Sequence, residues 1–290
     1  MSKEISLLET GRILQAAESI VLCTHVSPDG DTLGSALGLA RFLRQQGKQI
    51  TVFCDDDINK SLSFIPGIEM CQRPVEGSTV TADLLVVVDA SSFDRVGLVA
   101  DVVKPKVLLN IDHHISNTRF ADYLYLDDKA AAVGEVMCDL FEAMHWPMDE
   151  EMAVCFYTAI STDCGSFRYA NTTPKTMRNA ARLLEYGVQP NEISDCLDIR
   201  SRATVELLGK VLPSLSFACE GKIAYITITN DLYDKNAQTD SFVSYPRYID
   251  GVDVAVMFKA VEPEVIRVSM RSKSVDVAQV ALSFGGGGHL

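Results

Sequence analysis

The sequence predicts an α/β protein, with an N-terminal doubly wound, mostly parallel sheet followed by a smaller C-terminal α/β domain. Three observations support this fold class. Short apolar runs typical of buried strands alternate with helical segments through the first half of the chain, as in parallel sheets. The strong strands of this half each end in an acidic residue or a histidine. Beyond about residue 190, alternating or apolar strand segments dominate, which indicates a second domain.

The first elements form a strand–loop–helix–strand unit. A helix within residues 1–17 carries apolar residues at helical spacing and is expected to pack on the sheet. A buried strand at 19–24 is followed by a helix at 34–43, which Gly47 ends, and by a strand at 49–54. Such a unit is typical of a parallel sheet.

The remaining elements divide the chain into three parts. The first half adds buried strands at 83–88 and 107–112 and helices at 130–144, 150–162 and 174–186. The second half has three strands and a short helix, at 222–229, 253–258, 265–270 and 275–284. We therefore predict a first domain over residues 1–188, a linker helix within 189–212 and a second domain over 213–290.

Length and composition are those of an ordinary globular protein. The chain has 290 residues, enough for two domains of roughly 150 residues each. Its content of 47% hydrophobic and 22% charged residues allows a sizeable core. The sequence has neither an apolar run long enough to span a membrane nor a signal-peptide pattern. We therefore expect a cytoplasmic protein that does not engage a membrane.

Cysteines and charge exclude some classes of function. The eight cysteines are scattered without a Cys-x-x-Cys pair, which favours reduced, buried thiols over disulfides or a zinc site. Only Cys164, next to Asp163, is a candidate for catalysis. The net charge of −13 disfavours long nucleic acids, whose binding depends on neutralising many phosphates. A nucleic-acid substrate should therefore be short, with divalent cations compensating its charge.

Side chains that bind metals or transfer protons gather at the ends of four segments. The sets are His25, Asp29 and Asp31 after the strand at 19–24, Asp89 after the strand at 83–88, Asp112, His113 and His114 at the end of the strand at 107–112, and Asp163 after the helix at 150–162. Ligands of parallel sheets bind beyond the carboxyl ends of the strands. Carboxylates with imidazoles suit Mn²⁺ or Mg²⁺ better than the thiolate sets of structural zinc.

The number of candidate ligands indicates two ions, because six ligands exceed what one catalytic ion normally takes; they are His25, Asp29, Asp31, Asp89, His113 and Asp163. Asp89, an isolated acid after a central strand, is the natural bridging ligand. Two cations about 3.5–4 Å apart can hold a hydroxide and clamp a phosphate. Ordinary alternatives exist: Asp29 and Asp31 could cap a helix, and Asp89 could cap a turn. Asp163 could be an exposed acid. The conjunction of all four sets favours the metal centre.

Five ordered motifs carry a resemblance to a known family. The run His25-Val-Ser-Pro-Asp29-Gly-Asp31, the strand before Asp89, the run Asp112-His113-His114, and Asp163 are similar to the four motifs of the DHH phosphoesterase superfamily. The terminal glycine run with His289, preceded by Arg271 and Ser272, resembles the DHHA1 domain. Motifs and length together most resemble the bacterial nano-RNase/pAp phosphatase branch.

The resemblance implies roles for the residues of the first domain. The ligands of one ion would be His25, Asp29 and Asp89, and those of the second would be Asp31, Asp89, His113 and Asp163. The ions would be Mn²⁺, with Mg²⁺ as the alternative. Asp112 would orient His113, as acids behind ligating histidines do. His114 would reach the scissile phosphate, so the catalytic set is Asp89, Asp112 and His114.

The resemblance also assigns substrate binding to the second domain, across a cleft from the first. The expected residues are Arg271, Ser272, Gly286, Gly287, Gly288 and His289. Glycines suit this role because backbone without a Cβ can approach a phosphate or base closely. A disordered tail is the alternative reading of the glycine run. Relatives usually continue past this motif into a closing strand, so we expect a shortened C-terminal domain here.

The implied function is metal-dependent hydrolysis of very short RNA and of the 3′-phosphate of 3′-phosphoadenosine-5′-phosphate (pAp), by a homodimer. Cleavage of cyclic dinucleotides or their linear products is the alternative within the same chemistry. An inorganic pyrophosphatase would lack the glycine-rich motif, and a RecJ-type exonuclease would need further domains. From another class, a noncatalytic nucleotide or RNA sensor would be marked by degenerate ligands. No ligand position is degenerate in this sequence.

Overall fold

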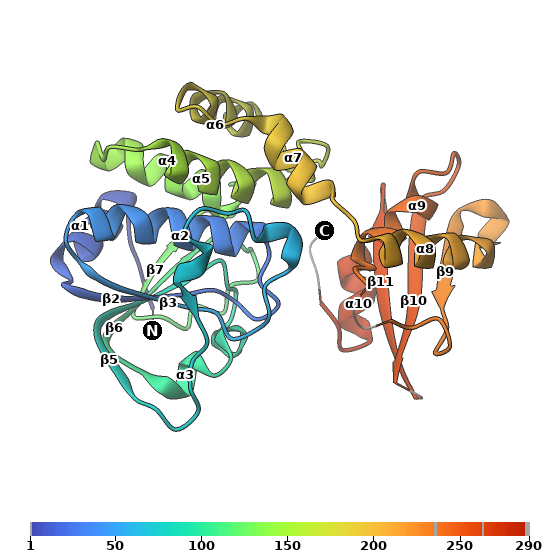
Figure 1. Ribbon diagram of the computed structural model, residues 1–290, viewed down its shortest axis with the longest axis horizontal. Helices are drawn as coiled ribbons and strands as arrows, with labels where there is room; N and C mark the ends of the chain where they lie inside the picture. The colour runs from blue at the N-terminus through green and yellow to red at the C-terminus, as the bar shows by residue number, and fades with distance from the viewer. Residues whose placement is uncertain (1, 235–236, 263, 288–290) are drawn as a thin grey trace. The chain divides into compact units, whose positions relative to one another are not determined.

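The chain divides into two compact units, Met1–Asp198 and Ile199–Leu290 (Figure 1). This computed structural model describes residues 2–234, 237–262 and 264–287. None of the helices in these ranges combines the length and the hydropathy that a membrane crossing requires.

A seven-stranded sheet forms the centre of the first unit (Figure 1). Its strands are β1 (Lys3–Glu4), β2 (Ser19–Cys23), β3 (Gln49–Phe53), β4 (Cys71–Gln72), β5 (Val80–Val88), β6 (Val103–Asp112) and β7 (Tyr123–Leu126). Their order is β1-β7-β6-β5-β2-β3-β4, and every neighbouring pair is parallel. The chain moves outward from β2 to β4 and then returns to β5 on the other side of β2. The topological switch point, where ligands of such sheets bind, therefore lies between β2 and β5.

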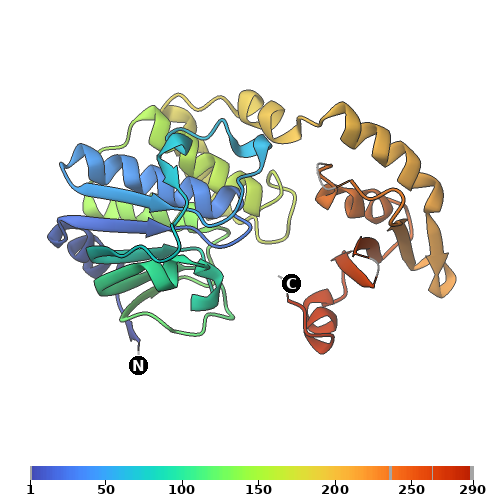
Figure 2. The same cartoon turned by 60° about the horizontal axis from the view of Figure 1, so that its bottom comes forward.

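Helices cover both faces of this sheet, unequally. They are α1 (Leu7–Ala16), α2 (Gly30–Gln45), α3 (Val99–Val102), α4 (Val133–Met144), α5 (Glu150–Asp163), α6 (Pro174–Glu185) and α7 (Pro190–Asp198). The larger helices gather on one face and the short α3 lies on the other (Figures 1 and 2). In β2, Ile20 and Leu22 face the larger core while Val21 and Cys23 face the smaller one. Burial on both faces explains the continuous apolar strand runs, and the predicted α/β fold class is confirmed.

Close packing of α2 against α5 brings two parts of the predicted site together. A Cβ at Gly34 would overlap the carbonyl oxygen of Cys155, and one at Gly38 would overlap the Phe156 ring. A Cβ at Gly30, the first residue of α2, would lie 2.5 Å from the side chain of Thr162. The start of α2 therefore adjoins the end of α5, because glycines leave no side chains between the helices.

The second unit contains a mixed four-stranded sheet, ordered β11-β10-β9-β8. The strands are β8 (Ser216–Ala218), β9 (Ile223–Ile228), β10 (Val254–Glu262) and β11 (Val265–Ser272), and the helices are α8 (Arg202–Val211), α9 (Ser244–Arg247) and α10 (Val277–Ser283). The β9–β10 pair is parallel, and the pairs β8–β9 and β10–β11 are antiparallel. A small apolar core includes Leu207 of α8, Phe242 and Met257 of β10.

Residues 189–212, expected to form a linker helix, contain two helices. The helix α7 belongs to the first unit, and α8 belongs to the second. Ser201 is the N-cap residue of α8, because its side chain accepts a hydrogen bond from the backbone N–H of Thr204 at 3.0 Å. Short 3₁₀ helices among the described residues are η1 (Lys60–Leu62), η2 (Ile68–Met70), η3 (Phe93–Val96), η4 (Leu212–Ser214), η5 (Cys219–Gly221) and η6 (Asp240–Val243).

Candidate metal centre

Three adjacent parallel strands and two helix ends bring the predicted site residues together. The strands β2, β5 and β6 are neighbours at the switch point and end just before His25, at Val88 before Asp89, and at Asp112. Asp29 is the N-cap residue of α2, and Asp163 is the last residue of α5. The site therefore lies where parallel α/β sheets place their ligands.

Asp89 lies between two groups of candidate ligands. Its Oδ2 is 3.4 Å from Nε2 of His25, which is also 3.6 Å from Oδ2 of Asp29. Its Oδ1 is 3.5 Å from Nε2 of His113. The same His113 nitrogen is 3.9 Å from Oδ2 of Asp31 and 3.6 Å from Oδ2 of Asp163. The two oxygens of Asp89 thus face different candidate ligands, His25 on one side and His113 on the other, as those of a bridging carboxylate would.

Backbone carbonyls orient both imidazoles toward the carboxylates. Nδ1 of His25 lies 2.8 Å from the carbonyl oxygen of Val26, and Nδ1 of His113 lies 3.0 Å from that of Ala130. The Ala130 carbonyl can only accept, so Nδ1 of His113 carries the hydrogen and Nε2 is the nitrogen that faces the carboxylates. Nδ1 of His25 also lies 3.1 Å from Nη2 of Arg95, which can only donate, so its two neighbours do not fix a single tautomer of that ring. Asp112, which was expected to orient His113, accepts the backbone N–H of that residue at 2.8 Å, while the Ala130 carbonyl lies at Nδ1 of its ring.

The N-terminus of α4 holds Asp31 in a buried position. Its Oδ2 accepts the N–H of Val133 at 2.7 Å, and its Oδ1 accepts the N–H of Gly134 at 2.9 Å. Ser35 adds a hydroxyl donor at 3.2 Å. Helix N-termini favour negative charge, so α4 stabilises a carboxylate that is 0% exposed.

Asp29 combines a helix cap with a place in the cluster. Its Oδ1 accepts the N–H groups of Asp31 and Thr32 at 3.0 and 3.1 Å, which is the capping arrangement considered from the sequence. Its Oδ2 faces His25. The capping role therefore leaves one oxygen of Asp29 available as a ligand.

Asp89 has an unusual backbone and an unsatisfied oxygen. Its φ of 60° lies in the left-handed region, which costs a non-glycine residue about 1–3 kcal/mol. Its N–H donates to the carbonyl oxygen of Ile111 at 3.0 Å, which holds this turn. Its Oδ1 is buried and accepts no hydrogen bond from the described residues. A buried carboxylate oxygen without a donor suits a cation, so the residues present fit a metal centre.

The electrostatics of the cluster indicate that protons occupy it in the absence of metal. Burial raises the pKa of Asp163 to about 7 and also raises the pKa of Asp31. Burial opposes the charge of His25, but Asp29 and Asp89 outweigh it and raise the pKa to about 10. Burial likewise opposes the charge of His113, yet Asp89 and Asp31 raise its pKa to about 11. Divalent cations would replace these protons.

His114 is fixed beside the cluster by Asp112. Its Nδ1 lies 2.7 Å from Oδ1 of Asp112, which is 0% exposed, and 3.6 Å from Oδ1 of Asp89. The buried carboxylate accepts the Nδ1 hydrogen, which sets the tautomer of the imidazole. Since Asp112 engages Nδ1, a contact between this ring and a reacting group would be made through Nε2.

Of the described substrate-binding candidates in the second unit, Arg271 and Ser272 are the last two residues of β11, and Gly286 and Gly287 follow α10. Oγ of Ser272 accepts the N–H groups of Ser274 and Val275 at 3.1 and 2.7 Å, so this hydroxyl shapes a turn. Arg271 is exposed and donates to the carbonyl oxygen of Met270 at 2.8 Å. Gly286 donates to the carbonyl oxygen of Ala281 at 2.8 Å, and a Cβ at Gly287 would meet open space. Gly288 and His289 lie outside the described residues.

Two polar residues near the cluster were not anticipated from the sequence. Asn110 is fully buried within β6, and Asn117 donates to both Asn110 and Asp112 at 2.7 and 2.6 Å. A lone asparagine inside the apolar run 107–111 was the available signal for Asn110. The loop position of Asn117 carried no comparable signal.

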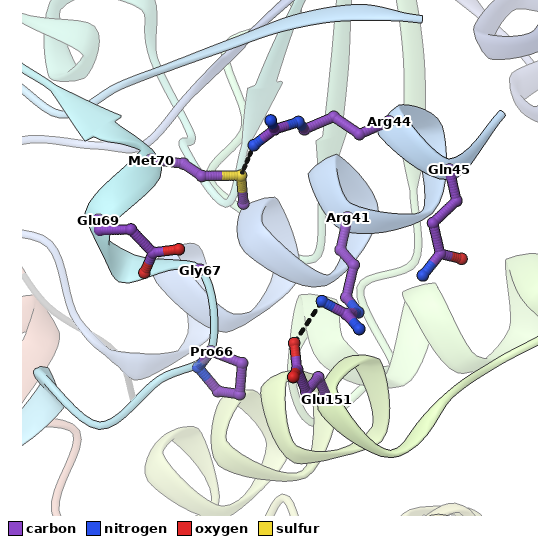
Figure 3. A pocket seen from close by; sticks show the side chains of 8 residues that line it. All are labelled: Arg41, Arg44, Gln45, Pro66, Gly67, Glu69, Met70 and Glu151. Carbon is purple, nitrogen blue, oxygen red and sulfur yellow. Dashed lines mark hydrogen bonds and ion pairs between the residues drawn. The ribbon is translucent and has the colours of Figure 1, made fainter. Parts of the chain in front are cut away.

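A separate cavity in the first unit does not coincide with this cluster. It has a volume of about 280 Å³, and its lining side chains are shown in Figure 3. Arg41 forms an ion pair there with Glu151, and Arg44 donates to Sδ of Met70 at 2.8 Å. None of the residues expected in the metal centre lines it.

Comparisons with known proteins agree with this geometry. The N-terminal domain of the DHH family matches residues 19–160. A Thermus thermophilus protein described as a bifunctional oligoribonuclease and PAP phosphatase, NrnA, is 36% identical over 280 residues, 96% of this chain and 84% of its own. The Bacillus subtilis protein of the same description is 29% identical over 287 residues, covering 96% and 89% of the two chains.

A solved structure agrees over both units. The crystal structure of an exopolyphosphatase-related protein from Bacteroides fragilis superposes with a TM-score of 0.89 at 26% identity, covering 98% of this chain and 88% of that one. These matches in sequence and fold cover 96–98% of the chain. The chain therefore belongs to the DHH phosphoesterase family, in the branch of the bifunctional oligoribonucleases and PAP phosphatases.

Proposed function

We propose that this phosphoesterase uses Mn²⁺ to hydrolyse short oligoribonucleotides and to remove the 3′-phosphate of pAp. Its relatives are described as bifunctional oligoribonucleases and PAP phosphatases, which supports the two kinds of substrate. One observation carries the proposal: the two carboxylate oxygens of buried Asp89 each face a different histidine within one cluster of acids. Phosphate esters are anionic, and a cluster of acids can bind them only through cations.

The ligands divide into two sets around Asp89. His25, Asp29 and Asp89 would hold one ion, and Asp31, His113 and Asp163 would hold the second together with Asp89. Ions bound there would polarise the phosphate and activate the attacking water. Oxygen and imidazole donors suit Mn²⁺, with Mg²⁺ as the alternative ion.

Two side chains of the protein, Asp112 and His114, would serve the phosphate and the leaving group. Asp112 holds the Nδ1 hydrogen of His114, so Nε2 is the nitrogen that would contact the scissile phosphate. There it can stabilise the charge that develops on a phosphate oxygen or supply a proton to the leaving oxygen. Both roles need a fixed imidazole, which the buried carboxylate provides.

Charge and the second unit together favour a small substrate. A net charge of −13 repels long RNA, whose binding grows with the number of phosphates neutralised by basic residues. Arg271, Ser272, the glycines at 286–288 and His289 are proposed to bind the terminal phosphate or base. The protein would work as a cytoplasmic homodimer, which rests on the family resemblance.

The test is Mn²⁺-dependent product release from a 5′-phosphorylated diribonucleotide, pAp, a cyclic dinucleotide and a long single-stranded RNA, measured side by side. Turnover of the first two, with little of the others, is expected. Cleavage of the cyclic dinucleotide alone would replace the substrate assignment. Binding without turnover of any substrate, in protein that holds metal, would indicate a nucleotide sensor instead of an enzyme.

A further inference from the structure

Asn110 connects the Asp89 turn with the next part of the site. Its Nδ2 donates to the carbonyl oxygens of Val87 and Ala90 at 3.1 and 3.3 Å. These two residues flank Val88 and Asp89 in the chain. Because carbonyl oxygens only accept, the Nδ2 end must face them, and Oδ1 must face away as an acceptor. The orientation of this buried amide is therefore fixed by its partners.

Asn117 uses its whole amide in the same network. Its Nδ2 lies 2.7 Å from Oδ1 of Asn110 and 2.6 Å from Oδ2 of Asp112, which is one hydrogen for each acceptor. Its Oδ1 accepts the N–H of Arg119 at 2.7 Å. Its own backbone N–H donates to the carbonyl oxygen of His114 at 3.1 Å. Both ends of the Asn117 side chain are thus specified.

Asp112 depends on this donor. Its Oδ1 accepts hydrogen bonds from the backbone N–H of His113 at 2.8 Å and from the Nδ1–H of His114 at 2.7 Å. Its Oδ2 accepts a hydrogen bond from Nδ2 of Asn117. Asp112 is 0% exposed with Asn117 in place, and loss of this donor would remove the hydrogen bond that Oδ2 receives from the protein. The carboxylate would rotate to recover a hydrogen bond, and the imidazole bonded to its other oxygen would move with it.

We propose that Asn117 is a positioning residue that holds Asp112, and through it the imidazole of His114, in the orientation used for phosphoester hydrolysis. The inference rests on the proposed function for its kinetic consequence. Its structural part, the hydrogen bond from His114 to Asp112, exists without metal or substrate. Loss of partners that orient a functional imidazole typically costs about 10–100-fold in activity.

Three variants of Asn117 separate positioning from space filling. Asn117→Ala removes the side chain, and Asn117→Asp keeps its shape but replaces the donor by an acceptor beside Asp112. Asn117→Ser leaves one hydroxyl donor, too few for two acceptors. The matched control is Thr118→Ala, which removes the 3.1 Å hydrogen bond from the neighbouring side chain to the Ser91 carbonyl. The measurements are kcat and KM on the diribonucleotide, the Kd for Mn²⁺, and the imidazole N–H proton resonance of His114 in metal-free protein.

For Asn117→Ala and Asn117→Asp, kcat is expected to fall about 10–100-fold while KM and the Kd for Mn²⁺ stay within about threefold. The His114 N–H resonance, identified by its loss in His114→Gln, is expected to shift or broaden. Asn117→Ser should retain an intermediate kcat, and Thr118→Ala should match the wild type.

Several results would overturn the inference. One is recovery of kcat by Asn117→Asp, since space filling would then be sufficient. Another is an unchanged His114 resonance in variants whose kcat falls, and a third is a loss of Mn²⁺ affinity as large as the loss of kcat. The resonance is measured without metal or substrate, so it decides the positioning even if the wild type hydrolyses neither proposed substrate.

Discussion

Asp89 is the side chain shared by both halves of the metal cluster, so its charge should matter most. Asn at this position keeps the shape and tolerates the left-handed backbone at a φ of 60°. We expect Asp89→Asn to fold, to bind less Mn²⁺ per chain and to lose at least about 100-fold in kcat/KM. Calorimetric Mn²⁺ titration and the diribonucleotide assay measure both effects. An active variant with full metal content would show that Asp89 does not bridge.

Because the metal-free cluster is protonated, its affinity for Mn²⁺ should depend on pH. Without metal, His25 and His113 have pKa values of about 10 and 11, and that of Asp163 is about 7. Mn²⁺ must displace these protons, so raising the pH removes competition and strengthens binding by about tenfold or more per pH unit between pH 6 and 8. Titrations in buffers of different ionisation enthalpy should register proton release. A Kd independent of pH and buffer would contradict this account of the cluster.

Sequence reasoning predicted the residues of the cluster better than their partners. His25, Asp89 and His113 follow buried strands, and the edge rule for parallel sheets brings such positions together. The carbonyl of Ala130 and the N–H groups that hold Asp31 come from segments distant along the chain. Such contacts depend on how the helices pack, and the spacing of residues along the sequence does not predict that packing. For the same reason, the sequence did not indicate that Asp112 contacts the His114 ring as well as the backbone of His113.

At the scale of elements, the α2–α5 contact sets the distance between Asp31 and Asp163. A methyl group at Gly34 would overlap the Cys155 carbonyl oxygen and force the helices apart. We expect Gly34→Ala to lower the free energy of unfolding by about 1–3 kcal/mol and to weaken Mn²⁺ binding. The control is Gly209→Ala in α8, where a Cβ meets nothing within 4 Å and the free energy should rise by up to about 1 kcal/mol. Equal stability of the two variants would contradict the close packing.

Elements with strong apolar runs were predictable, and short edge elements were not. The strand expected at 83–88 is the buried part of β5, and the helix expected at 150–162 is α5. By contrast β1 and β4 have two residues each, too few for any periodic pattern. Their strand geometry comes from pairing with β7 and β3 in the folded sheet. The parallel and antiparallel pairs of the second sheet could not be predicted either, since the alternation of apolar and polar residues does not specify which strand is the partner.

At the scale of the whole molecule, metal binding and substrate binding are assigned to different units and should separate in mutants. Arg271→Ala is expected to raise KM for the diribonucleotide about tenfold, with kcat and the Kd for Mn²⁺ nearly unchanged. Arg267→Ala is the control, because it removes the same charge from the same strand, β11. Equal KM values for the two variants would indicate that Arg271 contributes only general positive charge.

The central claim is that one cluster holds two divalent cations bridged by Asp89. Anomalous diffraction from crystals grown with Mn²⁺ tests it most directly. The account predicts two peaks about 3.5–4 Å apart, with Asp89 contacting both, His25 contacting one and His113 the other. A single peak, or two peaks that Asp89 does not join, would contradict it.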